Sequence, residues 1–449
     1  MALTDEQALA KIAQHLPVLD QRGKQFRRLE QYVTGECPLP PAIAKANVTK
    51  AYRMLMQFAQ TNYGRLIVKS ATSRLQVGGI RTGDDQLDSV LWDLWQANRL
   101  DAESRRAHDT ALTHGRAFAI VWPDGGVPGV TYEDPSTVLV EYREGSRYDR
   151  VSAVRRWVGA DKKPYVTLYT PDTLFKFVGE SEGRGGPGTK WQVRDEGHVD
   201  NPFGVVPVVE LAVNRKLRSG DRYGESYGDF EAVIGLLDRI NVLEFLRLVI
   251  AFTAGFPIRA VIGDKILRDD NGEPIAPYKL AVDQIAQFED PNTKLEQIPA
   301  ADVKGFGDAI DHDVETLAGI TQTPSYYLRS VPIQNVSADA IIASDSPLNA
   351  RIEDHKPDLS EGHEEILRVA ALMVDGRLEV PHAAQVYWVN KEARSLAAKA
   401  DAAAKLSGVM PWQFTAEQVF QLDQDTIARY ETQRASEQLL AAPPDPAAL

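Results

Sequence analysis

Residues 228–254 read GDFEAVIGLLDRINVLEFLRLVIAFTA, and this stretch decides the fold together with a returning segment at residues 301–320. At 1.5 Å per residue, it predicts a helix of about 40 Å. Its apolar residues lie nearly all round the helix, so it must be packed by neighbours on both flanks. It does not predict a membrane span, because its longest uncharged run, residues 248–258, has eleven residues and a span needs about twenty.

The returning segment, ADVKGFGDAIDHDVETLAGI, predicts a second helix with one apolar and one acidic face. Lys304 is the only cation on the acidic face, which carries a net charge of −4. The acids of this face are Asp302, Asp308, Asp311, Asp313 and Glu315. A metal site around His312 is less favoured, because neighbouring helical residues point in different directions. Copies of the two helices packed side by side in a ring would bury the first helix and give the ring an acidic inner wall.

The segments that follow and separate these helices are also patterned. Residues 256–298 predict a small β insertion, in which Asn271-Gly272 suits a hairpin turn. A loop at residues 323–335 precedes a long helix at residues 337–374, interrupted by two prolines that predict kinks. The remaining predictions are a strand at 385–389, two or three helices at 391–438 and a disordered tail.

The N-terminal half changes character at residue 116. The helices predicted before it are residues 3–33 (with a break or kink at Pro17), 49–75 (closing at Gly78-Gly79), 84–98 and 101–114. Residues 116–213 contain short runs rich in β-branched and aromatic residues, which predict an antiparallel β region. Within it, GRGGPGTK at residues 183–190 lacks the Gly-Lys-Ser/Thr order of a nucleotide-binding loop, and predicts a hairpin tip.

Composition excludes several classes of protein. A chain of 449 residues predicts two or three domains. With 43% apolar and 25% charged residues, it is a folded chain rather than a disordered or collagen-like one. The single cysteine, Cys37, excludes a disulfide within the chain and a cysteine-rich metal site. Asp5 and Glu6 stand where a signal peptide needs cations, so we expect a soluble chain made in the cytoplasm.

The net charge of −13 is distributed unevenly. Residues 21–81 contain eleven Lys and Arg residues against Glu30 and Glu36, so this segment carries +9 and the rest of the chain carries −22. Such asymmetry often marks surfaces with different partners, although a solvated basic helix face is an equal alternative. The candidate basic outer surface consists of Arg22, Lys24, Arg27 and Arg28.

The search for catalytic and cofactor sites is negative. The eight histidines show no metal-ligand spacing, and neither a nucleophile elbow nor a kinase signature is present. His355 and His363 are predicted to lie on the surface. We therefore expect no cofactor, no metal and no enzymatic activity.

Four segments together resemble a known family. They are VVPVVELAVNRKLRSGDRYGESYGDFEAVIGLLDRIN (205–241, with Asn214 and Gly224-Glu225-Ser226), LAGITQTPSYYL (317–328), SADAIIASDSPLNARIEDHKPDLSEGHEEILRVAALM (337–373) and VYWVNKEARSLAAKADAAAKLSGVMPWQF (386–414). This set resembles the portal proteins of tailed bacteriophages, of the type found in actinobacterial siphophages. No single segment is a catalytic-grade signature, so the specificity lies in the set.

The resemblance implies a helix-rich α+β fold with named regions. It implies an α/β wing, a stem made of a helical hairpin, a small α/β clip, a long kinked helix and a helical crown. The corresponding residues are 1–225 for the wing with a return strand near 384–390, 226–255 and 301–321 for the stem helices, 256–300 for the clip, 322–336 for a tunnel loop, 337–375 for the kinked helix, 391–438 for the crown and 439–449 for a disordered tail.

The resemblance also implies a function and partners. Portal proteins form dodecameric rings at one capsid vertex of the virion, through which double-stranded DNA is packaged and ejected, and no membrane is involved. The implied partners are further copies of the chain, the terminase large subunit, a head–tail adaptor, the major capsid protein, a scaffold protein and DNA. The alternatives are a non-portal helical minor head or scaffold protein and a nucleotide-dependent enzyme.

The same resemblance gives candidate channel residues. The acidic helix face would line the channel, where it would repel the DNA backbone and limit sticking. Tyr326, Tyr327, Leu328 and Arg329 would lie at or beside the tunnel loop, with Arg329 able to touch phosphate without base specificity. The alternative for the two tyrosines is packing against the kinked helix.

Overall fold

The computed structural model describes residues 3–37, 50–186, 188–217, 223–255, 259–262, 294–297, 303–329, 338–374, 378–389, 396–420, 422 and 424–441. The chain divides into two compact units. The larger contains Met1–Pro38, Asn62–Gly235 and Thr316–Leu449, and the smaller contains Leu39–Thr61 and Leu236–Glu315. Asn271-Gly272, Asp302, the second half of the predicted tunnel loop and the C-terminal tail lie outside the described residues.

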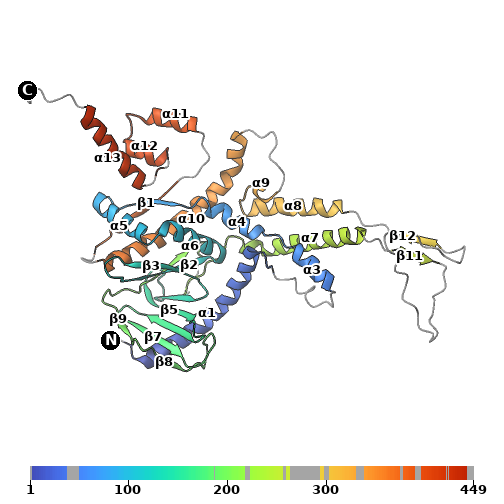
Figure 1. Cartoon of the computed structure of the whole chain (residues 1–449), viewed down its shortest axis with the longest axis horizontal. Helices are drawn as coiled ribbons and strands as arrows, with labels where there is room; N and C mark the ends of the chain where they lie inside the picture. The colour runs from blue at the N-terminus through green and yellow to red at the C-terminus, as the bar shows by residue number, and fades with distance from the viewer. Residues whose placement is uncertain are drawn as a thin grey trace, which may run out of the picture. The chain divides into compact units, whose positions relative to one another are not determined.

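Two antiparallel sheets form the centre of the larger unit, which confirms the β region predicted at residues 116–213 (Figure 1). One sheet has the order β10-β2-β3, formed by Val208–Ala212, Arg116–Trp122 and Gly129–Glu133. The other has the order β4-β5-β6-β7-β8, with β9 also paired to β7. Its strands are β4 Val138–Tyr142, β5 Arg150–Val158, β6 Pro164–Tyr169, β7 Thr173–Gly179, β8 Trp191–Val193 and β9 Val199–Asp200.

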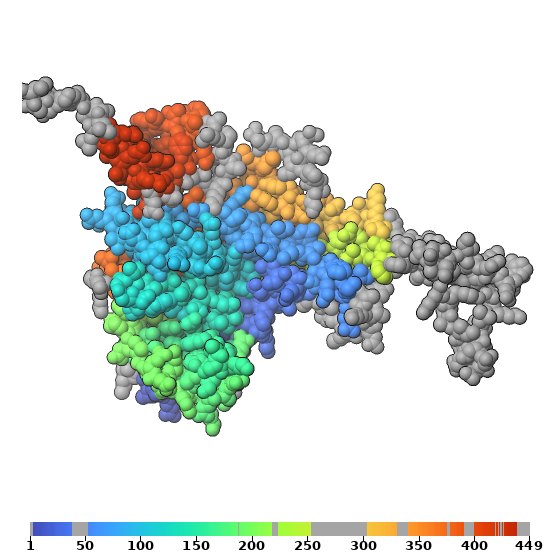
Figure 2. All heavy atoms as spheres, in the orientation of Figure 1, coloured from blue at the N-terminus to red at the C-terminus, as the bar shows by residue number. Residues whose placement is uncertain are grey.

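The second sheet is buried on both faces because its side chains alternate between two apolar layers. Ala153 of β5 packs with Phe118 of β2 in the layer between the sheets. The next residue, Val154, packs with Ile12 and Phe177 in the layer beneath helix α1 (Asp5–Thr34). Figure 2 shows the atoms of these strands, cyan to green, as one continuous mass.

Helix α1 corrects the prediction of a break at Pro17, because the helix continues through this residue. It begins with a capping box: the hydroxyl of Thr4 accepts from the Gln7 amide, and the side chain of Gln7 accepts from the Thr4 amide. It ends at Gly35, whose φ of 80° suits a glycine.

The helix predicted at residues 49–75 is two helices, α3 (Lys50–Phe58) and α4 (Tyr63–Thr72). In the connection between them, the side chain of Asn241 accepts from the Thr61 amide at 2.9 Å and from its hydroxyl at 2.7 Å. In a continuous helix the Thr61 amide would donate to a backbone carbonyl of the preceding turn. Here it donates to the Asn241 side chain instead.

Gly78 and Gly79 are not a helix end but part of strand β1 (Val77–Arg81), which pairs with β13 (Gln385–Trp388). A Cβ on Gly78 would lie 2.7 Å from the side chain of Val389, and one on Gly79 would lie 2.8 Å from that of Gln424. The glycines allow this close packing. The predicted return strand at 385–389 is confirmed.

Two further helices match the predictions closely. Helix α5 (Asp85–Ala97) begins where Asp84 accepts hydrogen bonds from the amides of Gln86 and Leu87. Helix α6 (Leu100–His114) ends at Gly115, whose φ is 81°.

Two long helices lie largely in the smaller unit, and both were predicted. Helix α7 (Ile234–Gly255) follows a short 3-10 turn, η1 (Glu231–Val233), and α8 (Lys304–Ile320) returns beside it in the opposite direction (Figure 1). Strands β11 (Arg259–Ile262) and β12 (Lys294–Gln297) pair antiparallel, as the predicted β insertion requires. No helix among the described residues is long and apolar enough to cross a membrane.

The C-terminal part of the chain is mainly helical. A single turn, α9 (Ser325–Leu328), precedes the long helix α10 (Ala338–Met373), which contains Pro347 and Pro357 without ending at either. Helix α10 packs on β10 and β2, and Gly362 allows close approach to Leu211. The last three helices are α11 (Leu396–Leu406), α12 (Trp412–Gln418) and α13 (Gln424–Ala441).

Candidate functional site: the helical hairpin and its base

The acidic face of α8 is smaller than the sequence predicts. Asp308, Asp311 and Glu315 are exposed, but the side chain of Asp313 is only 7% exposed. It accepts two hydrogen bonds from Arg239 of α7, from Nε at 2.7 Å and from Nη2 at 2.5 Å. Asp313 therefore joins the two helices of the hairpin, and its predicted place on the exposed face is wrong.

The apolar surface of α7 is only partly covered within the smaller unit. Phe245 is buried and packs with Met56 and Ala59 in and beside α3. Leu246 is 39% exposed and Phe252 is 49% exposed. This is the surface that the all-round apolar pattern of α7 leaves for other molecules to cover.

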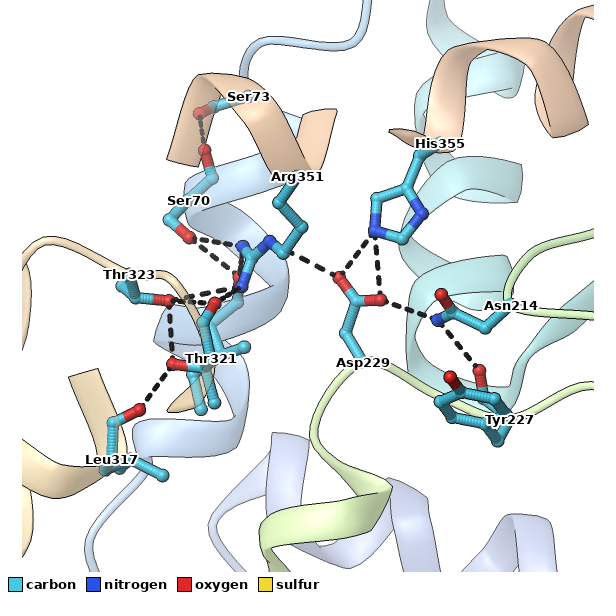
Figure 3. Close-up of polar contacts among 11 residues, drawn as sticks. Ser70, Ser73, Asn214, Tyr227, Asp229, Leu317, Thr321, Thr323, Arg351 and His355 are labelled. Atoms are coloured by element: carbon cyan, nitrogen blue, oxygen red, sulfur yellow. Dashed lines mark hydrogen bonds and ion pairs between the residues drawn. The ribbon is translucent and has the colours of Figure 1, made fainter. Parts of the chain in front are cut away.

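One polar cluster of the larger unit contains the residues that come just before α7 and just after α8 in the chain (Figure 3). We call this the base cluster: Ser70, Asn214, Asp229, Thr321, Thr323, Arg351 and His355. Asp229 lies just before η1 and α7, and its side chain is 3% exposed. It accepts from the Asn214 amide group at 3.0 Å and lies 3.0 Å from His355 Nε2. Asn214 has a φ of 52°, a conformation that asparagine adopts more readily than most residues.

Arg351 of α10 connects the remaining members of the base cluster. Its guanidinium donates to the Ile67 carbonyl at 3.0 Å and to the Ser70 hydroxyl at 3.1 Å, both in α4. It also donates to the Thr321 carbonyl and, at 3.2 Å, to the Thr323 hydroxyl. These threonines follow α8 directly, so one side chain joins α10, α4 and the end of α8.

The end of α8 is suited to this contact. The Thr321 hydroxyl donates to the Leu317 carbonyl at 2.8 Å, and the Thr323 amide donates to the Ala318 carbonyl at 3.0 Å. These bonds satisfy carbonyls that the helix leaves without partners. The positive charge of Arg351 beside them is favourable, because a helix C-terminus carries partial negative charge.

The charges of the base cluster compensate one another. Burial alone would raise the pKa of Asp229, but the hydrogen bond and charge of His355 and the charge of Arg351, 3.8 Å away, lower it. Burial lowers the pKa of Arg351, and Asp229 opposes this change. The buried charge of Asp229 is thus stabilised first by His355 and then by Arg351.

The predicted tunnel-loop residues lie in and after the turn α9, so part of the predicted loop is helical. Tyr326 donates to Asp345 of α10, and Arg74, two residues after the end of α4, donates to the same carboxylate at 2.7 Å. The hydroxyl of Tyr327 accepts from Arg74 at 3.2 Å. Tyr326 thus contacts the long helix, as the packing alternative predicts, while Tyr327 contacts Arg74 after α4 and is 40% exposed. Leu328 is buried, and Arg329 is half-buried.

The four predicted basic residues of α1 do not share one environment. Arg22 is half-buried and donates to the backbone carbonyls of Tyr223 at 3.3 Å and Gly224 at 3.1 Å. Lys24, Arg27 and Arg28 are exposed. Arg22 is therefore less exposed than the other three residues of the predicted outer surface.

The prediction that His355 and His363 lie on the surface is wrong, since both are buried. His363 Nε2 lies 2.8 Å from Nε2 of His108, and its Nδ1 lies 3.2 Å from the Tyr132 hydroxyl. The sequence contained a signal for this burial. The buried residues of α10 recur every three or four positions, at Leu348, Ile352, His355, Leu359, His363 and Ile366.

Within the described residues, no group of three or more His, Cys, Asp or Glu side chains could hold a metal ion. The polar groups of the base cluster bind one another and the ends of helices. Their arrangement is that of a structural joint among α4, α10 and the chain segments that flank α7 and α8.

Comparison with known proteins identifies the family. The family model described as phage portal protein, SPP1 Gp6-like, matches residues 16–439, so the chain belongs to this family. The portal protein of Mycobacterium phage L5 is 32% identical over 383 residues, covering 80% of this chain and 75% of that protein. That of Mycobacterium phage D29 is 30% identical over 381 residues, with the same coverage of 80% and 75%.

A solved structure also aligns with the chain. A chain in the neck of a native GTA particle with C12 symmetry aligns with a TM-score of 0.44 and 12% identity. The alignment covers 82% of this chain and 93% of that one.

Proposed function

We propose that the chain assembles into a ring-shaped portal at one capsid vertex of a phage virion, where double-stranded DNA enters during packaging and leaves during ejection. The observation that carries this proposal is the family match over residues 16–439. The proposed role is structural, and assembly takes place in the host cytoplasm.

The proposed regions follow the elements of the structure. The two sheets with α1 and α4–α6 are the wing, the pair α7 and α8 is the stem, and β11 with β12 belongs to the clip. The long helix α10 leads to a crown formed by α11–α13. The partly exposed apolar surface of α7 supports a stem that packs against neighbouring copies in a ring, which we propose has twelve subunits.

The exposed acids of α8 are the proposed channel wall. Asp308, Asp311 and Glu315 would repel the phosphates of passing DNA. Asp313 is not part of this wall, since it is buried against Arg239. The turn at Tyr326–Arg329 begins the proposed tunnel loop.

The proposed partners are other phage proteins. The clip would dock the terminase large subunit during packaging and a head–tail adaptor afterwards. The wing and its basic α1 surface would meet the major capsid protein, scaffold protein or packaged DNA.

Electron microscopy of the purified full-length chain tests the proposal. We expect rings with a central channel and about twelve copies. A strict monomer at all salt and protein concentrations would contradict the ring. Rings without a channel would favour a minor head or scaffold protein, and an NTPase activity sensitive to mutation would favour an enzyme.

A further inference from the structure

Two arginines from distant parts of the sequence converge on one glycine of α1. A Cβ built on Gly23 would lie 3.2 Å from Nη2 of Arg184 and 3.6 Å from Nη1 of Arg27. Arg27 lies one turn further along α1, and Arg184 belongs to the Gly-rich connection between β7 and β8. The glycine leaves room for both guanidinium groups, which cover it.

A buried third arginine holds the Gly-rich connection in this place. The side chain of Arg156 is 2% exposed and donates to the Gly185 carbonyl at 2.9 Å and to Asp20 of α1 at 2.6 Å. Because Gly185 follows Arg184 directly, this bridge ties Arg184 to α1. The position of Arg184 is therefore built by the fold rather than left to a loose loop tip.

The convergence leaves excess positive charge at the surface. Within the part of the chain that the structure describes, no carboxylate forms an ion pair with Arg27 or Arg184, while Asp20 is engaged by Arg156. Burial and the positive charges of Arg156 and Arg27 lower the pKa of Arg184, and Asp20 and Asp134 oppose this change only in part.

The surroundings of the pair extend the positive surface. Lys24 and Arg28 are exposed on the same helix; Lys24 stands three positions before Arg27 and four positions before Arg28, so these side chains are neighbours on the helix surface. Glu30 is the nearest exposed acid further along α1, and it lies 3.1 Å from His114 Nε2. The exposed large apolar side chains of the described residues include none from α1.

We propose that Arg27 and Arg184 form a binding site for the phosphate backbone of double-stranded DNA. The forked donors of two adjacent guanidinium groups match phosphate oxygens. Protein–protein interfaces have an apolar core in which charged residues are depleted, whereas DNA interfaces are strongly positive. A basic surface without exposed apolar anchors therefore fits DNA better than an acidic protein.

This site would give the portal a DNA contact separate from the acidic channel face. It rests on the proposed function only for the source of the DNA. The binding test below measures the purified protein with added duplex, so it can fail while ring images support the portal, and the reverse is equally true.

The experiment is the salt dependence of binding of a labelled duplex to the full-length protein, measured by fluorescence anisotropy. The salt slope, meaning here the magnitude of the negative slope of log K against log salt, falls by about 0.9 for each lost phosphate contact. The double variant Arg27→Gln/Arg184→Gln should therefore lower the slope by about 1.8. Light scattering verifies that each variant keeps the oligomeric state of the wild type.

Two further variants make the test specific. Arg106→Gln/Arg143→Gln makes the same change of charge at arginines that are 74% and 70% exposed and ion-paired elsewhere, and should leave the slope unchanged. Gly23→Met keeps every charge but places a side chain where the two arginines converge, and should lower the slope. Methionine is a better helix former than glycine by nearly 1 kcal/mol, so α1 should remain folded.

Three results would overturn the proposal. One is a wild-type slope in Arg27→Gln/Arg184→Gln, or a loss equal to that of the control variant. Another is a wild-type slope in Gly23→Met, which would show that the convergence is irrelevant. The third is binding of a poly-glutamate peptide that is tighter than DNA binding and is lost in the same double variant, because this would assign the site to an acidic protein.

Discussion

The charged side chains of the hairpin and of the base cluster differ in their burial and in the number of their partners. In the hairpin, one ion pair joins α7 to α8, between buried Asp313 and Arg239, whose side chain is 59% exposed. In the base cluster, Asp229 and Arg351 are both nearly buried, and their side chains bind Asn214, Ser70 and the end of α8. The side chains of the base cluster bind one another and nearby backbone carbonyls within one chain, whereas the hairpin leaves apolar side chains of α7 at the surface.

This difference separates contacts that stabilise the isolated chain, in the base cluster, from a surface of α7 that only another molecule could cover. A buried charged network loses much stability when one member is removed, because the other members stay buried without their partner. A half-exposed apolar helix loses little when a surface side chain is changed, unless a neighbouring molecule covers that side chain. The predictions below separate the two cases, ordered by their effect on the stability of the isolated chain.

The largest effect is expected from Arg351→Leu. It removes the positive charge 3.8 Å from the Asp229 carboxylate and the guanidinium that donates to the Thr321 and Ile67 carbonyls, at an expected cost of about 3–5 kcal/mol, as for other broken buried ion pairs. Hydrogen exchange should rise at the end of α8 and in α9, and chemical unfolding should start at lower denaturant concentration. Arg351→Lys should also be destabilised, because an ammonium group cannot reproduce the planar fork.

The matched control for this prediction is Arg106→Leu. Arg106 is 74% exposed and pairs with Glu103 three residues before it. The change should alter the free energy of unfolding by less than about 0.5 kcal/mol. If Arg351→Leu and Arg106→Leu lower the free energy of unfolding equally, the base cluster is not important for stability.

A second large effect concerns pH and the buried histidine pair on α6 and α10. Burial lowers the pKa of His108 from 6.5 to about 4, and lowers that of His363 as well. Above pH 6.5 the His108 imidazole is neutral in the folded and unfolded states alike. Below that, the unfolded chain binds a proton that the folded chain does not, so stability falls between pH 6.5 and about 4, by about 3 kcal/mol for His108.

Unfolding titrations at pH 7 and pH 4.5 test this expectation. His108→Gln should reduce the loss of stability on acidification, because glutamine does not titrate. His312→Gln, at an exposed position of α8, should keep the dependence of the wild type. Identical pH profiles for the wild type and His108→Gln would contradict the assignment.

The sequence predicted the elements of both regions better than their contacts. Local sequence signals were sufficient where neighbouring residues determine the structure. Helix α5 begins after Asp84 and helix α6 ends at Gly115, and alternating apolar residues define the sheets. These signals failed where the partner is distant in the chain. Strand β1 was missed because its pairing partner is β13, and Asp313 was misplaced because its position depends on Arg239 of another helix.

The contacts of the base cluster could not be predicted from the sequence either. Asn214 and the segment before α7 stood out in the sequence, but nothing local indicated that they bind His355 of α10 through Asp229. The charge and polarity of these residues favour a surface position, and only their mutual pairing makes burial tolerable. A helical stripe of buried positions in α10 was the signal that could have corrected His355 and His363.

A smaller effect on the isolated chain is expected from Leu246→Gln/Phe252→Gln in α7. Glutamine is a good helix former and both side chains are already 39% and 49% exposed, so the free energy of unfolding should change by less than about 1 kcal/mol. If neighbouring copies cover this surface, ring formation should nevertheless fail. Light scattering and electron microscopy measure the result, with Val90→Gln on α5 as the helical control. Normal rings in the α7 variant would show that this surface is not an interface between copies.

The smallest effect on stability should come from the exposed acids of α8. Asp308→Asn, Asp311→Asn and Glu315→Gln together remove three negative charges without touching the pair of Asp313 and Arg239. Unfolding and ring formation should be unchanged, while DNA should move more slowly in a packaging assay, because removal of the repulsion lets phosphates dwell on the wall. Asp313→Asn, in contrast, should loosen α7 from α8 and should not by itself slow the DNA. If packaging proceeds at the wild-type rate in the triple variant, the acidic face of α8 does not line the channel.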